Sequence, residues 1–388
     1  MAQRRDRRLS PQQGKMLTRA SKLGGPVDLG GVRLSDLEMV GLLQVLKTDL
    51  EKSYDQNGRL EKPSSSTGYF SMGLDAFTDP GAVRDVAEAL LREDRSYLVT
   101  ALVQACEEIP DFMSAFEALC EIHKRRLKFR RIVAEQRIPE IEDISPRAIL
   151  EWGIVPGQEL ESFMRWRKWF YDIDNRAAQE TGYMLTKVMS LVLGGQYHSA
   201  KTSPIRRMGY TGGTHRSVDC IAGRTAYDFK ARMTDAPSRR ARLEDELAFA
   251  RDCFTSGFKP ILLVLKEDDP ELSQEMIEAY AMYDGESHFG DAAWRHIREV
   301  ASPTMRRFAD LYVRGPMEAV DGDHQLHPMT VDMNPERFGL IVSPPLTAEA
   351  PEPKRKQPRA PYEPPKRAKP QKIVMPRWEP KQTDKQKK

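Results

Sequence analysis

Three residues in one short segment have the types and spacing expected of a hydrolytic metal site: Asp219, Asp228 and Lys230. Gly223 lies midway between the two aspartates, and a glycine there suits the first position of a two-residue type II′ turn. Such a turn places the aspartates opposite each other on paired strands, with Cβ atoms about 5 Å apart. Lys230, two residues beyond Asp228, points to the same face. We therefore predict that the three side chains converge on one face of a β-hairpin.

Two carboxylates held this close repel each other unless a cation lies between them. Mg²⁺ prefers oxygen ligands and commonly uses one or two carboxylates together with water and substrate phosphate. A neighbouring ammonium group can position the attacking water or stabilise charge on the phosphate. The pattern thus predicts Mg²⁺-dependent hydrolysis of a phosphodiester. The alternative is a surface hairpin whose charges are simply solvated.

The elements expected around the hairpin would place it in a sheet. A helix over residues 239–254 and an apolar strand over residues 260–265 form a crossover to a parallel neighbouring strand. An amphipathic helix over about residues 159–193, ending at Gly194, precedes the hairpin. We predict that one stripe of the crossover helix covers the sheet: Leu243, Leu247, Ala250 and Phe254. Apolar residues of the hairpin should fill its other face: Val218, Cys220, Tyr227 and Phe229.

The charge distribution around the hairpin favours a nucleic acid as partner. The 38 residues from Thr181 to Val218 contain no Asp or Glu, as a DNA-facing surface requires. Three arginines at the start of the crossover helix oppose its dipole, which favours an external anion, although exposure to solvent would also explain them. We predict that the following residues contact DNA: Arg206, Arg207, His215, Arg216, Arg239, Arg240 and Arg242. The basic run at residues 124–131 is either a solvated helix face or a phosphate contact.

Composition divides the chain of 388 residues into four parts. Residues 1–30 are polar and expected to be loosely ordered, and residues 31–150 are mainly helical, beginning with a capping box at Ser35 and Glu38. Residues 151–345 would hold the sheet. Residues 346–388 are rich in Lys and Pro and expected to be disordered. From Pro351 onward, 13 Lys or Arg accompany 4 Asp or Glu, so the overall charge of +3 comes from this tail. The tail would add affinity for DNA or bind a partner.

Several classes of protein are disfavoured by what the sequence lacks. No apolar stretch is long enough to span a membrane, and no signal peptide or nucleotide-binding motif is present. Four scattered cysteines without a CxxC pair argue against zinc and fit a cytoplasmic protein. We interpret the pairs His288/His296 and His324/His327 as incidental. The aromatic group Trp166, Trp169, Phe170 and Tyr171 indicates helix core or a dimer contact more than a platform for stacked bases.

The order of elements resembles the common core of the PD-(D/E)XK nucleases, and residues 211–265 look most like the ApaLI-like type II restriction endonucleases. The resemblance implies an α/β fold with a mixed central sheet flanked by helices. It also implies Mg²⁺-dependent, site-specific cleavage of double-stranded DNA by a homodimer. Asp219 and Asp228 match the two acids of the motif and Lys230 its lysine. Glu180 matches a glutamate that many such nucleases place near the metal. Val218 stands where the motif has Pro, and Asp228 where Glu is commoner.

Two other functions stay open at this point. A recombination or repair nuclease of the phage type would use the same site without sequence specificity. A noncatalytic DNA-binding scaffold would use the basic segments and be indifferent to Mg²⁺. The recognition sequence does not follow from the chain, because base contacts depend on loop geometry.

Overall fold

The computed structural model describes residues 8–24, 31–51, 68–144, 158–209, 214–232, 240–266, 270–321, 329–332 and 339–342. The chain divides into two compact units. One comprises residues 1–324 with 333–338, and the other residues 325–332 with 339–388. Within its described residues, the second unit is an antiparallel hairpin of β8 (Met329–Asp332) and β9 (Gly339–Val342). The predicted disordered tail, residues 346–388, lies outside the described residues.

The first unit contains a five-stranded mixed sheet of order β3-β4-β5-β6-β7. β3, β4 and β5 are antiparallel neighbours, whereas β5, β6 and β7 are parallel. The strands are β3 (Gln196–His198), β4 (Val218–Ala222), β5 (Thr225–Arg232), β6 (Lys259–Lys266) and β7 (Glu286–Phe289). The predicted hairpin is β4-β5, and the predicted crossover leads through α8 (Arg240–Thr255) to β6. The expected α/β sheet flanked by helices is confirmed, with the short edge strands β3 and β7 added.

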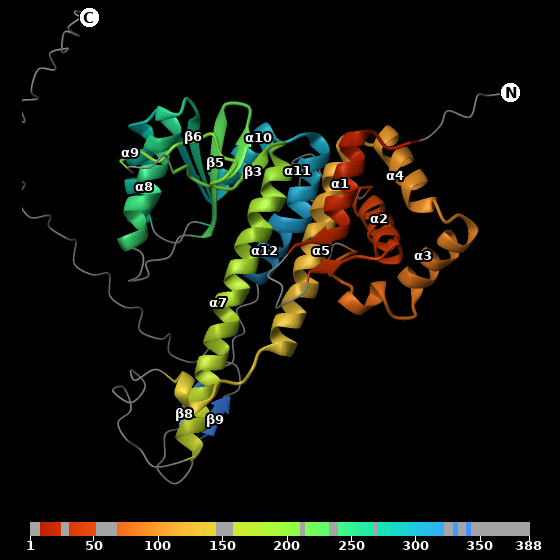
Figure 1. Cartoon of the computed structure of the whole chain (residues 1–388), viewed down its shortest axis with the longest axis horizontal. Coiled ribbons are helices and arrows are strands. Elements are labelled where there is room, and N and C mark those ends of the chain that lie inside the picture. The colour runs from red at the N-terminus through yellow and green to blue at the C-terminus, as the bar shows by residue number, and fades with distance from the viewer. Residues whose placement is uncertain are drawn as a thin grey trace, which may run out of the picture. The chain divides into compact units, whose positions relative to one another are not determined.

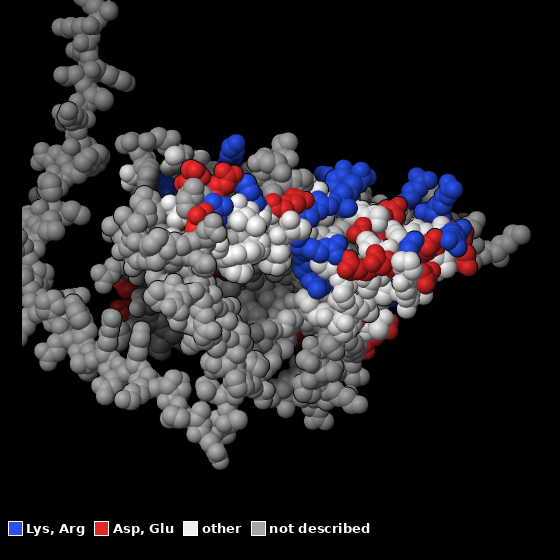
Figure 2. Space-filling model, turned by 90° about the horizontal axis from the view of Figure 1, so that it is seen from below, with Lys and Arg blue, Asp and Glu red and all other residues white. Residues whose placement is uncertain are grey.

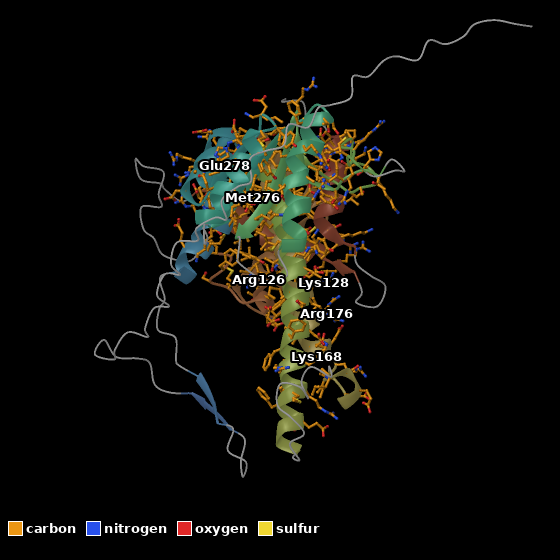
Figure 3. The ribbon with its side chains drawn as sticks, turned by 90° about the vertical axis from the view of Figure 1, so that its left-hand side faces the viewer. Arg126, Lys128, Lys168, Arg176, Met276 and Glu278 are labelled. Atoms are coloured by element: carbon orange, nitrogen blue, oxygen red, sulfur yellow. The ribbon has the colours of Figure 1, made fainter. Side chains whose placement is uncertain are left out.

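Helices cover both faces of the sheet (Figure 1). On one face, α8 and α9 (Pro270–Ala281) bury a cluster that includes Phe249, Leu262 and Met276. Figure 3 shows Met276 on α9; it is fully buried, whereas Glu278, two residues later, is exposed. On the other face, α7 (Gln158–Val192) and α10 (Asp291–Val300) pack against β4, β5 and β6. The long helix predicted before the hairpin is therefore α7, which ends at Val192, two residues before Gly194, whose φ of +66° fits the predicted terminating glycine.

The packing of the sheet differs from the prediction at two positions. Phe254 is 51% exposed, contrary to the prediction, whereas Leu247 and Ala250 pack against the sheet as predicted. Phe249 and Cys253 of α8 are buried beside them, and the side chain of Leu243 lies outside the described residues. Val218 packs in the cluster under α8, whereas Cys220 packs under α7. Val218 and Cys220, which are two residues apart, would share a face in a regular strand. The start of β4 is therefore irregular.

The N-terminal part is helical, as predicted, but begins earlier than expected. Pro11–Ser21 forms helix α1, which a capping box of Ser10 and Gln13 initiates. Its Arg19 binds the buried Glu117 through two hydrogen bonds of 2.7 Å, so this segment is fixed rather than loosely ordered. The α-helices described between residues 31 and 135 are α2 (Asp36–Leu50), α3 (Ala82–Glu93), α4 (Tyr97–Glu108) and α5 (Phe112–Glu135).

α2 begins at the predicted capping box of Ser35 and Glu38. The last of these helices, α5, lies beside α7 (Figure 1). After α10, the chain of the first unit continues through α11 (Pro303–Ala309) and a π-helical turn into α12 (Gly315–Asp321). Among the described residues, no helix combines the length and apolarity that crossing a bilayer would need.

Candidate active site

The hairpin that carries the predicted residues has the turn expected of it. Gly223 has a φ of +60°, and Arg224, which follows it, does not adopt a positive φ. This combination belongs to a type II′ turn, because a type I′ turn needs positive φ at both positions. The strands pair from Ala222 and Thr225 outward to Cys220 and Tyr227. The predicted register is therefore confirmed over these pairs.

The backbone pairing of β4 with β5 ends before Asp219, and there the side chain of Asp219 hydrogen-bonds to β5. Oδ2 of Asp219 accepts a hydrogen bond of 3.0 Å from the backbone N–H of Phe229, a group that a strand carbonyl would accept in a continuing ladder. The carboxylate of Asp219 is thereby held against β5, beside Asp228.

Two hydroxyl side chains of α7 hold Asp219 from the other side. The hydroxyl of Thr186 donates to Oδ1 of Asp219 at 3.0 Å. The hydroxyl of Ser190, one turn later, donates to the backbone carbonyl of Asp219 at 2.7 Å. Neither residue was predicted to belong to the site. The available signal was a pair of hydroxyl residues at i and i+4 in the apolar end of a helix, where their side chains need buried partners.

The electrostatics of the two aspartates favour a cation between them. Burial and the adjacent charge of Asp228 raise the pKa of Asp219 to about 7, and a hydrogen bond between the two carboxyl groups contributes. Nζ of Lys230 lies 3.0 Å from Oδ1 of Asp228, whose side chain is 11% exposed. The three predicted residues thus lie together. Two adjacent carboxylates, of which Asp219 has a raised pKa, fit a divalent ion, which would relieve their repulsion.

The structure does not bring Glu180 to the aspartates. Its carboxylate forms ion pairs with Arg125 and with Lys128, the latter at 2.6 Å, and Figure 3 shows Lys128 beside α7. Burial raises the pKa of Glu180, but the hydrogen bonds and charges of these two cations lower it by more, so the pKa lies below its ordinary value. Glu180 precedes Thr186 by six residues, which corresponds to about 240° of rotation and about 9 Å of rise along the helix. It therefore faces α5 rather than Asp219.

The predicted DNA-contacting residues fall into three groups. Arg216 is buried, and its Nε donates at 2.9 Å to Asp252, whose side chain is 1% exposed. Its charge is thus neutralised in the interior, contrary to the expectation of a DNA contact. Arg206 is exposed and pairs through its backbone with His215, and Arg207 is half-buried beside them. Arg239 lies outside the described residues, and Arg240 and Arg242 lie in the first turn of α8.

The basic run of α5 is largely occupied by contacts within the protein. Nζ of Lys124 donates to the backbone carbonyls of Arg19 and Lys22, at 2.6 and 3.0 Å. Arg130 binds Asp75, and Arg125 and Lys128 bind Glu180. Of the two interpretations offered for this run, the solvated helix face describes the exposed Arg130, whereas Lys124, Arg125 and Lys128 are held by contacts within the protein. On the face drawn in Figure 2, basic and acidic side chains are likewise intermingled.

Comparison with known proteins gives a consistent result. Residues 82–314 match the family described as ApaLI-like restriction endonuclease, a range that includes the hairpin and the whole of α7. The chain is 35% identical over 325 residues to the type II restriction enzyme ApaLI of Acetobacter pasteurianus, which covers 81% of this chain and 83% of the relative. No solved structure matches the chain.

Proposed function

Because the chain belongs to the ApaLI-like restriction endonucleases, we propose that it is a type II site-specific deoxyribonuclease that cleaves double-stranded DNA in a restriction–modification system. The observation that carries the proposal is the convergence of Asp219, Asp228 and Lys230 on one hairpin. This arrangement supports a PD-(D/E)XK core, which we assign to residues 151–345.

We assign the metal site to Asp219 and Asp228, with Mg²⁺ as the ion. When bound, Mg²⁺ supplies charge stabilisation at the phosphate and a lower pKa for a coordinated water. Asp219 is suited to hold it because Thr186 and Phe229 fix its two oxygens. We assign Glu180 to the contact between α5 and α7 and not to the metal.

Lys230 is the group proposed to assist the attacking water. Its ammonium lies beside Asp228 and remains 29% exposed, so it is held at the carboxylate pair while one side stays open to substrate. There it can orient a water molecule and stabilise negative charge that develops on the phosphate oxygens.

Binding of DNA is proposed to use cations that keep access to solvent. Arg206, Arg207 and His215 form one such group. Arg239, Arg240 and Arg242 precede or begin α8, the helix that follows the strand carrying Asp228 and Lys230. Phosphate contacts from these residues would set affinity, whereas base contacts would set the recognition sequence.

A homodimer is proposed to read a palindromic site. Aromatic side chains on α7 are more exposed than a monomer surface requires: Trp166 by 46%, Phe170 by 60% and Tyr171 by 62%. They are therefore not helix core, and we assign them to the dimer contact. Light scattering should show that Phe170→Ser dissociates the dimer at concentrations where Tyr197→Ser, an exposed aromatic residue of β3, leaves it intact. An unchanged mass for Phe170→Ser would remove this surface from the interface.

The test of the function is cleavage of unmethylated phage DNA with Mg²⁺ or with EDTA, resolved on a gel. We expect discrete fragments that need Mg²⁺ and disappear in Asp228→Asn, while Asp85→Asn, an exposed aspartate of α3, cleaves normally. Sequencing of the fragment ends would then give the recognition site. A metal-dependent smear would instead identify a nuclease without sequence specificity, and DNA binding without cleavage would identify a scaffold.

A further inference from the structure

Two histidines and a glutamate meet on the α10 face of the sheet, opposite the face toward which Asp228 points. Glu286 and His288 are alternate residues of β7, so they share one face of that strand, and His296 lies on α10. Their metal-ligating atoms all lie within 4.8 Å of one another. The rings of His288 and His296 stack with centroids 4.5 Å apart. The two histidines, which looked incidental in the sequence, are therefore neighbours.

From this cluster we propose a second metal site that binds a divalent transition-metal ion such as Zn²⁺ through Glu286, His288 and His296. Imidazole nitrogens and a carboxylate oxygen form a donor set that suits Zn²⁺ and not Mg²⁺, which prefers oxygen alone. With bonds of about 2.0 Å, tetrahedral zinc holds its ligand atoms about 3.3 Å apart. The three ligand atoms already lie within 4.8 Å of one another, and small side-chain rotations would bring them to the separation that zinc requires.

Two of the three ligands have a partner that would lie outside the coordination shell of a metal. One oxygen of Glu286 binds Lys259, and the other lies 3.1 Å from Nε2 of His288. A metal would replace this second contact and keep the first, which orients the carboxylate from outside the metal's coordination shell. The hydroxyl of Tyr227 lies 3.4 Å from Nε2 of His296 and holds that ring in the same way.

This site is separate from the aspartate pair. In the parallel register Asp228 aligns with Leu262 and Ser287, and these residues face α8 and α9. His288 aligns with Leu263, which packs in the cluster on the α10 face. Asp228 and the cluster of Glu286, His288 and His296 thus lie on opposite faces of the sheet, and the two sites use different donors. Tyr227, which is next to Asp228 in β5, contacts His296.

Its expected role is to fix the edge of the sheet. β7 is a four-residue edge strand, and the side chains of Glu286 and His288 meet His296 of α10 at the cluster. A bound metal links β7, α10 and, through Tyr227, the strand that carries Asp228. Metal bound there would stabilise the folded state by its binding energy.

The test uses the full chain, purified without a polyhistidine tag, stripped with a chelator and returned to buffer containing excess Mg²⁺. Titration with Co²⁺ should produce visible absorption at one equivalent, and Zn²⁺ should displace it and raise the Tm. Asp219→Asn with Asp228→Asn should keep the same stoichiometry, because that double variant removes only the oxygen site. DNA cleavage is not a readout, so the result does not depend on the nuclease assignment.

Loss of any one ligand should weaken Co²⁺ binding at least about 100-fold, because even partners outside the coordination shell change metal affinity by about 10- to 100-fold. Glu286→Gln is the first variant to use, since its side chain is 42% exposed and its replacement retains the shape of the residue. His198→Gln, in β3, is the matched control and should bind as wild type. The proposal would be overturned if the wild-type protein gave no absorption band. It would also be overturned if Glu286→Gln and His288→Gln bound Co²⁺ as tightly as the wild-type protein does.

Discussion

The hydroxyl of Thr186 donates a hydrogen bond of 3.0 Å to Oδ1 of Asp219 and so couples the end of α7 to the candidate metal site. We expect Thr186→Val, which keeps the shape and removes the donor, to reduce cleavage about 10-fold, since a hydrogen bond to a charged group is worth about 1.5–3 kcal/mol. The measurement is the cleavage rate as a function of Mg²⁺ concentration. A purely structural role for Thr186 would leave the Mg²⁺ dependence unchanged, whereas the positioning role predicts that more Mg²⁺ is needed. Thr186→Ser restores the donor and should recover most of the activity.

Asp219→Asn should stabilise the metal-free protein at high pH. Burial and Asp228 raise the folded-state pKa of Asp219 from 3.8 to about 7. The folded state therefore binds a proton more tightly than the unfolded state, and stability falls as the pH rises from about 4 through 7. Each pKa unit corresponds to about 1.4 kcal/mol. In EDTA at pH 8, thermal unfolding should occur at a higher temperature for Asp219→Asn than for wild type, and at pH 4 the two should converge.

Mg²⁺ should reverse that order at pH 8. It relieves the repulsion in the wild-type protein and raises its Tm, whereas the variant has lost a ligand. A variant that is less stable than wild type in EDTA at pH 8 would show instead that the hydrogen bonds of Asp219 outweigh the cost of its charge.

Arg216→Met should destabilise the fold without a specific effect on DNA affinity. The substitution leaves the buried carboxylate of Asp252 without its cation, and breaking a buried ion pair in this way costs about 3–5 kcal/mol. Urea unfolding should show the loss, and combination with Asp252→Leu should recover part of it, because the unpaired charge is then removed. Wild-type stability for Arg216→Met would indicate that the pair is solvated.

Arg206 and Arg207 should contribute to DNA affinity through phosphate contacts. Replacing both with alanine should weaken binding to all sequences alike and lower the salt dependence of the binding constant by about one unit for each phosphate that is no longer neutralised. The control is Arg95→Ala, an exposed arginine after α3. Fluorescence anisotropy with Asp228→Asn as the background measures binding without cleavage. An unchanged salt dependence would assign the DNA contacts to other residues, such as those at the start of α8.

The parts of the site that are local in sequence could be predicted from it, and the long-range parts could not. Gly223 defines the turn, and the turn sets the register of the strands that carry Asp219 and Asp228. The partner of Arg216 is 36 residues away, and nothing in the local pattern distinguishes an arginine that binds DNA from one that binds Asp252.

The same limit explains why helix α1 and strand β7 were not predicted. The polar sequence of Pro11–Ser21 gives little apolar periodicity, and its order depends on the contact of Arg19 with Glu117, 98 residues away. β7 consists of Glu286, Ser287, His288 and Phe289, which has no apolar alternation, and it exists because β6 offers a parallel edge.

The two-residue turn at Gly223 has a consequence for how this hairpin can diverge among relatives. Side chains alternate between faces with a period of two, so one residue inserted between Asp219 and Asp228 would move the carboxylate of Asp219 out of register with Asp228. Substitutions along the strands alter the packing gradually, whereas adding or removing one residue between the two acids shifts the register that brings them together. We therefore expect homologous hairpins to differ freely in composition while keeping nine positions from the first acid to the second.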